Sequence, residues 1–102
     1  MGRALHNHVP FEWDDAKKAA NPGKHDGVTF EEAFEAFFDP GARLVDAGRR
    51  GESRDALIGY GTQSRILYVV HVEILEGDGG FRLISARKAT REERARYEDG
   101  DP

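Results

Sequence analysis

The sequence of 102 residues contains no cysteine. A disulfide framework, a zinc–thiolate site and a cysteine nucleophile are therefore excluded, and stability must come from packing. No apolar run approaches the roughly 18 to 20 residues of a membrane-spanning helix, and the N-terminus lacks the hydrophobic stretch of a signal peptide. We expect a soluble, cytoplasmic protein that does not associate with membranes. A chain this short is expected to fold as one domain around one core.

The chain also lacks the strong positive charge of a protein that coats nucleic acid, because its formal net charge is −4. Residues 1–53 carry seven Lys or Arg against ten Asp or Glu, residues 54–97 carry eight against six, and the last five residues add three acids. A local basic site in the second half remains compatible with this distribution. Eleven of the fifteen cations are Arg, which favours oriented bidentate contacts, although a GC-rich genome produces the same bias.

The start of the chain predicts a lead-in, a short strand and a helix. Residues 1–10 show no periodicity, so we expect them to form a flexible lead-in. The segment Phe11-Glu12-Trp13-Asp14 alternates aromatic and acidic residues, which is typical of a brief strand followed by a helix capped at Asp14. We expect that helix to end at Asn21-Pro22-Gly23, because proline disfavours helical geometry in the residue before it. A loop over residues 24–27 follows.

A second helix is marked at both of its ends. Thr29 and Glu32 form a predicted capping box, and Asp39-Pro40-Gly41 provides a stop. The apolar residues recur at the spacing of one helical face: Phe30, Ala33, Phe34, Phe37 and Phe38. The polar face is predicted to carry Glu31, Glu32 and Glu35. Four phenylalanines on one face indicate that this helix packs on a sheet.

The second half predicts a sheet and a terminal helix. Residues 41–53 permit either a weak strand or a mobile loop. We predict three strands, over residues 54–60, 65–72 and 81–87; the nearly unbroken apolar run of the middle one favours a central position. The glycine-rich turn at residues 76–80 predicts that the last two strands pair antiparallel, and a capping box at Thr90 and Glu93 predicts a helix to about residue 98. The result is an α+β fold with N-terminal helices packed on one side of an antiparallel β-sheet and a short C-terminal helix.

The first candidate site is a group of residues around the last predicted hairpin: Arg65, Arg82, Ser85, Arg87 and Lys88. The start of one hairpin strand lies beside the end of the next, so Arg65 should approach Arg87 and Lys88. Converging cations suit a phosphodiester, because they stabilise the negative charge of a pentavalent transition state. The alternative is that these cations are solvated over the core. Strict alternation places Arg82 and Arg87 on opposite faces, so a bulge or the end of the strand must reconcile them.

Further candidates lie elsewhere in the chain. Lys24 and His25 are adjacent in a predicted loop, where a histidine can transfer a proton and a lysine can hold a phosphate; simple solvation is the alternative. Tyr97 on the terminal helix suits either base stacking or proton donation, or else anchoring of that helix to the sheet. His6 and His8 with His25 would allow a metal-dependent nuclease, but histidines in a flexible lead-in make a poor metal site.

Several motifs follow one another between residues 11 and 98: Phe11-Glu12-Trp13-Asp14 with Lys17 and Asn21, Lys24-His25, Val28-Thr29-Phe30-Glu31-Glu32-Ala33 with Phe37 and Asp39-Pro40, Ile58-Gly59, and Ser85-Ala86-Arg87-Lys88-Ala89-Thr90 through Glu93 to Tyr97. This ordered set resembles the BrnT toxin family. The resemblance implies one RelE-like domain over residues 11–98, followed by an acidic tail over residues 99–102. It also implies the toxin of a type II toxin–antitoxin system, an endoribonuclease that needs no metal or other cofactor and inhibits translation.

The resemblance further implies which residues act on RNA. RNA carries its own nucleophile, the 2′-hydroxyl, so the enzyme must orient the backbone, assist proton transfer and stabilise charge. The family's Lys-His pair is matched by Lys24 and His25, its Ser-Ala-Arg-Lys-Ala-Thr ending supplies Ser85, Arg87 and Lys88, and its other basic or aromatic positions fall at Arg65, Arg82 and Tyr97. We predict proton transfer by His25, phosphate binding by Arg65, Arg82 and Arg87, and base stacking by Tyr97.

Two departures from the family pattern lower the local positive charge. Asp26 stands where glycine usually follows the Lys-His pair. Glu73 and Glu76 occupy the hairpin before the last strand, where the family commonly has an arginine. Both changes lower the local positive potential and are therefore expected to bear on catalytic competence more than on family membership.

The implied partners are RNA and BrnA, a ribbon-helix-helix antitoxin through which DNA would be contacted only indirectly. A basic antitoxin would complement the acidic first half and tail of this chain, since complementary charge speeds encounter; solubility is the alternative reason for the acids. The competing function is a non-catalytic partner-binding or co-repressor module with the same fold. RNA cleavage in EDTA favours the enzyme, complex formation without growth arrest favours the module, and chelator-sensitive cleavage favours the metal-dependent nuclease.

Overall fold

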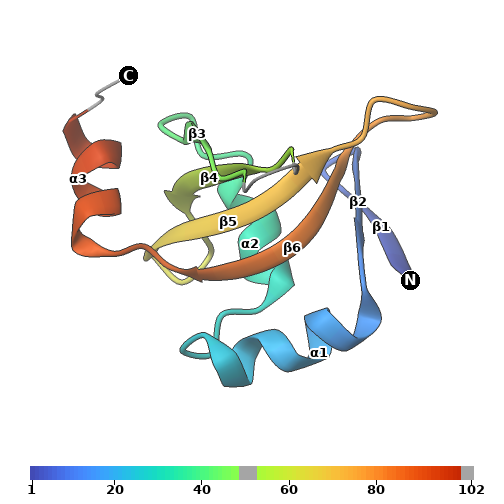
Figure 1. Ribbon diagram of the computed structural model, residues 1–102, viewed down its shortest axis with the longest axis horizontal. Coiled ribbons are helices and arrows are strands. Elements are labelled where there is room, and N and C mark those ends of the chain that lie inside the picture. The colour runs from blue at the N-terminus through green and yellow to red at the C-terminus, as the bar shows by residue number, and fades with distance from the viewer. Residues whose placement is uncertain (49–52, 100–102) are drawn as a thin grey trace.

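A mixed β-sheet flanked by helices is seen in the computed structural model, which describes residues 1–48 and 53–99 (Figure 1). Its elements are β1 (Gly2–His6), β2 (Val9–Trp13), α1 (Asp15–Lys24), α2 (Phe30–Ala36), β3 (Arg43–Asp46), β4 (Asp55–Tyr60), β5 (Ile66–Glu73), β6 (Phe81–Lys88) and α3 (Arg91–Asp99). The six strands are ordered β1-β2-β6-β5-β4-β3, and every neighbouring pair is antiparallel except β2 and β6, which are parallel. The predicted α+β class and the interior position of β5 are confirmed. No helix in the described ranges is long and apolar enough to cross a membrane.

The prediction of a flexible lead-in at residues 1–10 is wrong, because β1 pairs with β2 in an antiparallel hairpin. The turn residues Asn7 and His8 both have positive φ angles, 49° and 69°, as a tight two-residue hairpin turn requires. The central residues of β1 are exposed, so this edge strand is held by backbone pairing and shows no hydrophobic alternation. The absence of periodicity therefore concealed a strand, and the sheet begins before the expected domain start at residue 11.

The predicted end of the first helix at Asn21-Pro22-Gly23 is also wrong, since α1 continues to Lys24. Asn21 is buried, and its Nδ2 donates to the carbonyls of Val28 at 2.8 Å and Ala86 at 2.7 Å, while its Oδ1 accepts from the Ala86 N–H at 3.2 Å. These tertiary bonds hold the helical backbone in place although Pro22 lacks a backbone donor. β2 pairs with β6 only over Phe81–Leu83, and Asn21 supplies hydrogen-bonding partners further along β6.

The main core lies between α2 and one face of the sheet, behind β5 and β6 in Figure 1. Its buried residues are Phe11, Val28, Phe30, Ala33, Phe34, Ala36, Leu67, Val69, Leu83 and Ala86. Thr29 caps α2 as predicted, accepting from the Glu32 N–H at 3.0 Å. The placement of Glu32 on a polar face is wrong, because its side chain is only 4% exposed and pairs with Arg65. The phenylalanines meet the sheet as expected.

The opposite face of the sheet carries a smaller core beneath α3. Ile58, Ile66 and Ala89 are buried there, with Tyr68 and Tyr97 packed against them. The predicted capping box of α3 is confirmed in both directions, since the Glu93 N–H donates to Thr90 Oγ1 and the Thr90 N–H donates to Glu93 Oε1.

The structure describes only part of two segments whose form the sequence left open, residues 41–53 and the acidic tail at 99–102. The stretch at 41–53 contains β3, so its strand interpretation is confirmed there, whereas residues 49–52 lie outside the described residues. Asp99 of the expected acidic tail belongs to α3, and residues 100–102 also lie outside the described residues.

Candidate functional site

A bulge in β6 brings Arg82, Ser85 and Arg87 to the same face of the sheet. Val70 pairs with Ser85 but His71 pairs with Leu83, so one residue of β6, Ile84, has no partner on β5. Leu83 and Ala86 consequently both point into the main core beneath α2. Arg82, Ser85 and Arg87 take the other face, and the expectation that a bulge or strand end must reconcile the two arginines is confirmed.

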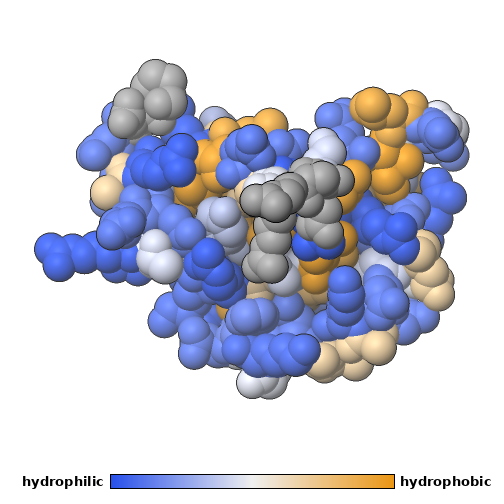
Figure 2. Space-filling model, in the orientation of Figure 1, coloured by the Kyte–Doolittle hydropathy of each residue, from blue (hydrophilic) through white to orange (hydrophobic). Residues whose placement is uncertain are grey.

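That face forms a cleft with α1, which we call the α1–β6 cleft. One lobe of about 140 Å³ is lined by Lys17, Asn21, Lys24, His25, Ile84 and Ser85. The adjoining lobe of about 290 Å³ is lined by Asp14, Lys17, Arg54, Val72, Arg82, Leu83 and Ile84. The lobes share the lining residues Lys17 and Ile84 and therefore lie side by side. Figure 2, which shows the sheet from the side opposite α2, displays mostly hydrophilic surface with separate hydrophobic patches.

The charged lining of the α1–β6 cleft is mainly basic. Its cationic side chains are Lys17, Lys24, Arg54 and Arg82, and His25 adds an imidazole. Among the described lining residues, the one acid is Asp14 at the start of α1. A hydrogen bond from the Lys17 backbone N–H lowers the pKa of Asp14, so this carboxylate stays ionised and caps the helix. The cleft thus brings several cations together, and one of them, Arg82, also lies 3.9 Å from the Glu12 carboxylate.

The α1 helix positions its share of the cleft through residue spacing. Lys17, Asn21 and Lys24 are four and three residues apart and therefore lie on one helical face. The hydrogen bonds of Asn21 to Ala86 fix this face beside Ser85, the preceding residue of β6. The backbone N–H of His25 donates to the Asn21 carbonyl at 3.0 Å and caps the helix. The predicted residues Lys24, His25 and Ser85 are thus brought together, with Arg82 in the adjoining lobe.

Sequence reasoning missed two lining residues, Lys17 and Arg54. The spacing of Lys17 from Lys24, seven residues along one helix, was a usable signal, but the early helix end assigned at Asn21 concealed it. Arg54 carries no local signal, because its place beside Arg82 follows from the order of strands in the sheet.

Arg65 is held away from this cleft by a carboxylate of α2. Its Nε and Nη2 donate to Glu32 at 2.9 and 2.8 Å, and its Nη1 donates to the Asp26 carbonyl at 3.3 Å. The hydrogen bonds with Glu32 raise the pKa of Arg65. Arg65 therefore ties the loop that carries His25 to the start of β5.

Arg87 is held by α3 instead. Its Nη1 and Nη2 donate to the two carboxylate oxygens of Glu93 at 2.7 and 2.9 Å, and its guanidinium carbon lies 4.2 Å from the centre of the Tyr68 ring. The hydrogen bonds with Glu93 raise the pKa of Arg87. Arg87 remains about 7 Å along the strand from Ser85, on the same face.

The expected convergence of Arg65, Arg87 and Lys88 is not formed by their side chains. The backbone is arranged as predicted, since Leu67, two residues after Arg65, pairs with Lys88. Arg65 nevertheless turns to α2 and Arg87 to α3, and Lys88, as the next residue of the strand, points to the face opposite Arg87. Each of the two arginines pairs with a carboxylate instead of approaching the other, because an ion pair is attractive whereas neighbouring cations repel each other.

Tyr97 lies where it anchors α3. Its hydroxyl donates to Asp39 Oδ2 at 2.7 Å, and its ring meets that of Tyr60 edge-on with centroids 5.5 Å apart. The hydrogen bond to Asp39 raises the pKa of Tyr97 to about 12. Burial opposes ionisation of Asp39, but hydrogen bonds from Tyr60, Tyr97 and Gly41 together lower its pKa.

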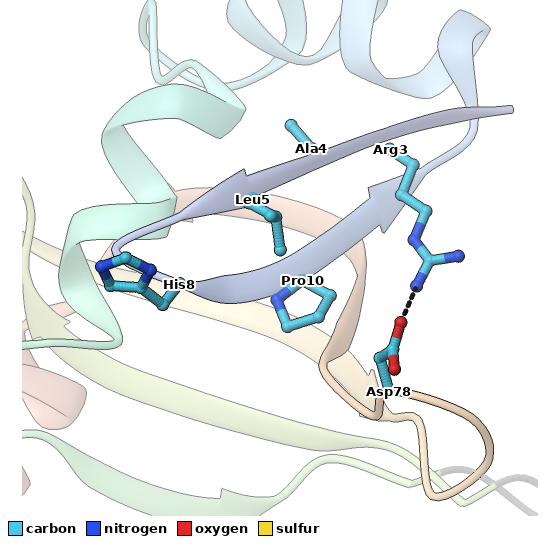
Figure 3. A pocket seen from close by; sticks show the side chains of 6 residues that line it. All are labelled: Arg3, Ala4, Leu5, His8, Pro10 and Asp78. Carbon is cyan, nitrogen blue, oxygen red and sulfur yellow. Dashed lines mark ion pairs between the residues drawn. The ribbon is translucent and has the colours of Figure 1, made fainter.

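The three histidines weighed as metal ligands lie apart. His6 is hydrogen-bonded to Glu35 and packs against Phe34. His8 lines an open surface hollow of about 610 Å³ over β1 and β2, beside the 4.0 Å ion pair of Arg3 and Asp78 (Figure 3). His25 lines the α1–β6 cleft. Across residues 1–48 and 53–99, no three His, Cys, Asp or Glu side chains are grouped to hold a metal ion.

Comparison with known proteins identifies the family of this chain. No curated protein matches the chain. Residues 13–93 match the family model described as the ribonuclease toxin, BrnT, of type II toxin–antitoxin systems, and the matched region includes α1, β6 and every described residue of the α1–β6 cleft. The chain therefore belongs to the BrnT family of ribonuclease toxins.

Proposed function

We propose that this ribonuclease toxin binds single-stranded RNA in the α1–β6 cleft and cleaves it there without a metal ion. The observation that carries the proposal is the pair of adjoining lobes, one lined by Lys24, His25 and Ser85 and the other by Arg82, with Lys17 lining both. Cleavage of cytoplasmic messenger RNA would inhibit translation, and a cognate antitoxin would relieve the inhibition.

The proposed reaction is attack of a ribose 2′-hydroxyl on the neighbouring phosphate. A bond forms between the 2′-oxygen and phosphorus while the bond from phosphorus to the 5′-oxygen breaks. The proton of the 2′-hydroxyl passes to a general base, and the 5′-oxygen receives a proton from a general acid. The products are a 2′,3′-cyclic phosphate and a 5′-hydroxyl, so the reaction needs no co-reactant and cuts within the chain.

Each lining residue has a role that its position supports. His25 is the proton-transfer group, because it is a partly exposed imidazole in the same lobe as Ser85. Lys24 and Arg82 hold the phosphate and stabilise the charge that develops on its oxygens, and the Ser85 hydroxyl donates a hydrogen bond to it. Lys17 binds the RNA backbone where the lobes meet.

In this proposal, most of the remaining predicted residues hold neighbouring segments in place and do not contact the RNA. Arg65 holds the carbonyl of Asp26 and so fixes the loop beside His25. Arg87 holds Glu93 at the start of α3, and Tyr97 secures the same helix through Asp39. Lys88 is exposed and adds positive charge at the end of β6.

The test is cleavage of a fluorescent single-stranded RNA by the purified toxin in EDTA. We expect cyclic-phosphate products, and we expect His25→Ala and Arg82→Ala to lower the cleavage rate at least a hundredfold and tenfold, respectively, without loss of folding by circular dichroism. Arg94→Ala is the matched control, because Arg94 lies on α3 outside the cleft. Intact RNA would favour the non-catalytic partner-binding module, and cleavage that EDTA abolishes would contradict a metal-free reaction.

A further inference from the structure

The α2 face of the sheet is not fully covered, and an apolar groove remains beyond the end of α2. The groove has a volume of about 320 Å³, and Phe37, Phe38, Leu57 and Phe81 form much of its wall. Leu44 lines it from β3, the edge strand, with 63% of its surface exposed. A lining this apolar is costly to leave in water, so it favours an occupant with large hydrophobic side chains.

The charged residues that line the groove are acidic, whereas those that line the α1–β6 cleft are mainly basic. Among its described lining residues, the charged side chains are the carboxylates of Asp55 and Glu73. His71 also lines the groove but is buried, and burial lowers its pKa and favours the neutral ring. An RNA backbone would be repelled here, whereas a protein segment with Lys or Arg beside an apolar anchor would be attracted. Glu73, the last residue of β5, thus contributes its carboxylate to this surface.

We infer that the apolar groove is a docking site for the cognate antitoxin, which inserts a hydrophobic side chain between Phe37 and Leu57 and places basic residues against Asp55 and Glu73. A type II toxin is neutralised by a protein that binds it, so a partner of this class must exist for a BrnT toxin. A second copy of this chain fits less well, because facing grooves would bring like carboxylates together. The inference concerns a surface separate from the proposed cleavage site.

The experiment measures the affinity of the purified toxin for its cognate antitoxin by titration calorimetry. Leu44→Glu and Glu73→Arg should each weaken binding at least tenfold, because the first puts a charge into the apolar contact and the second repels the basic flank. Leu5→Glu is the matched control, since Leu5 is 72% exposed on β1 and outside the groove. The affinity of Leu5→Glu for the antitoxin should equal that of the unchanged toxin. Because Glu73 acts through charge, antitoxin binding should also weaken as the salt concentration rises.

Three outcomes would overturn the inference. The first is an unchanged antitoxin affinity in both groove variants. The second is an equal loss in Leu5→Glu, which would indicate a nonspecific effect. The third is a concentration-dependent dimer of the toxin alone that Leu44→Glu abolishes, which would assign the groove to self-association. Groove variants that still cleave RNA are folded. A groove variant that loses antitoxin binding but keeps RNA cleavage, together with His25→Ala, which should lose cleavage, separates this inference from the cleavage proposal.

Discussion

The side chain of Asn21 exchanges two hydrogen bonds with the backbone of Ala86, one in each direction. The amide group of Asn21 thereby behaves like a peptide unit of an additional strand, placed where β2 no longer accompanies β6. The same side chain also donates to Val28. One buried residue consequently joins α1, the segment before α2 and the strand that carries Ser85.

Asn21→Ala should therefore damage both stability and activity. The buried backbone groups of Ala86 and Val28 lose their partners, and an unsatisfied buried group costs about 1–3 kcal/mol, so we expect a loss of about 3 kcal/mol in the free energy of unfolding. Urea denaturation measures this loss. Ala19→Ser, an exposed change on the same helix, is the control and should be nearly neutral. A loss below about 1 kcal/mol would contradict the role assigned to Asn21.

Lys17→Ala should weaken RNA binding, because Lys17 lines both lobes of the α1–β6 cleft. Losing one phosphate contact reduces the slope of log affinity against log salt by about 0.7 for single-stranded nucleic acid. Fluorescence anisotropy with an RNA carrying a 2′-methoxy block against cleavage measures affinity and slope together. Lys18→Ala is the neighbouring control, since the Lys18 ammonium is 2.8 Å from Glu31 and outside the cleft. Equal slopes for both variants would remove Lys17 from the interface.

Glu93→Gln should destabilise the fold at neutral pH and have less effect in acid. Burial opposes ionisation of Glu93, but hydrogen bonds from Arg87 and Thr90 together lower its pKa below the ordinary 4.5. A lowered carboxylate pKa contributes stability that is present above about pH 4.5 and is lost as pH falls through the folded value. We expect a difference of about 1–2 kcal/mol at pH 7, typical of a charge-assisted hydrogen bond. Thermal melts at pH 7 and pH 3 check it, and an equal difference at both would contradict this linkage.

Tyr97→Phe should remove the hydrogen bond to Asp39 and lower stability by about 1 kcal/mol at neutral pH. The pKa of Tyr97 is raised to about 12, so its contribution is fully present below the ordinary tyrosine pKa of 10.0 and is lost as pH rises through about 12. Absorbance titration of the phenolates should show a late step that vanishes in this variant. Tyr60→Phe is the control, because Tyr60 is 43% exposed, and it should leave the late step in place.

Elements with strong local signals were predictable from sequence. The caps at Asp14, Thr29 and Thr90 mark helix starts because each side-chain oxygen accepts from a backbone N–H nearby in the sequence. The nearly unbroken apolar run of β5 reflects its interior position in the sheet. β1 escaped prediction because an exposed edge strand depends on backbone pairing, which leaves little trace in side-chain pattern.

Several residues that line the α1–β6 cleft were predictable from the sequence, but their arrangement was not. Lys24, His25, Arg82 and Ser85 were identified and do line one cleft. The positions of Arg65 and Arg87 depend on Glu32 and Glu93, whose carboxylates come from α2 and α3 on opposite faces of the sheet. Such ion pairs are chosen by tertiary packing, which no local pattern encodes.

The parallel pairing of β2 with β6 has a consequence for synthesis of the toxin. β2 and α1 are made early, but β6, which completes the sheet and forms one wall of the α1–β6 cleft, ends only at Lys88. A polypeptide still growing on the ribosome therefore cannot close the α1–β6 cleft until Lys88 has emerged, and the segments made earlier do not form it by themselves.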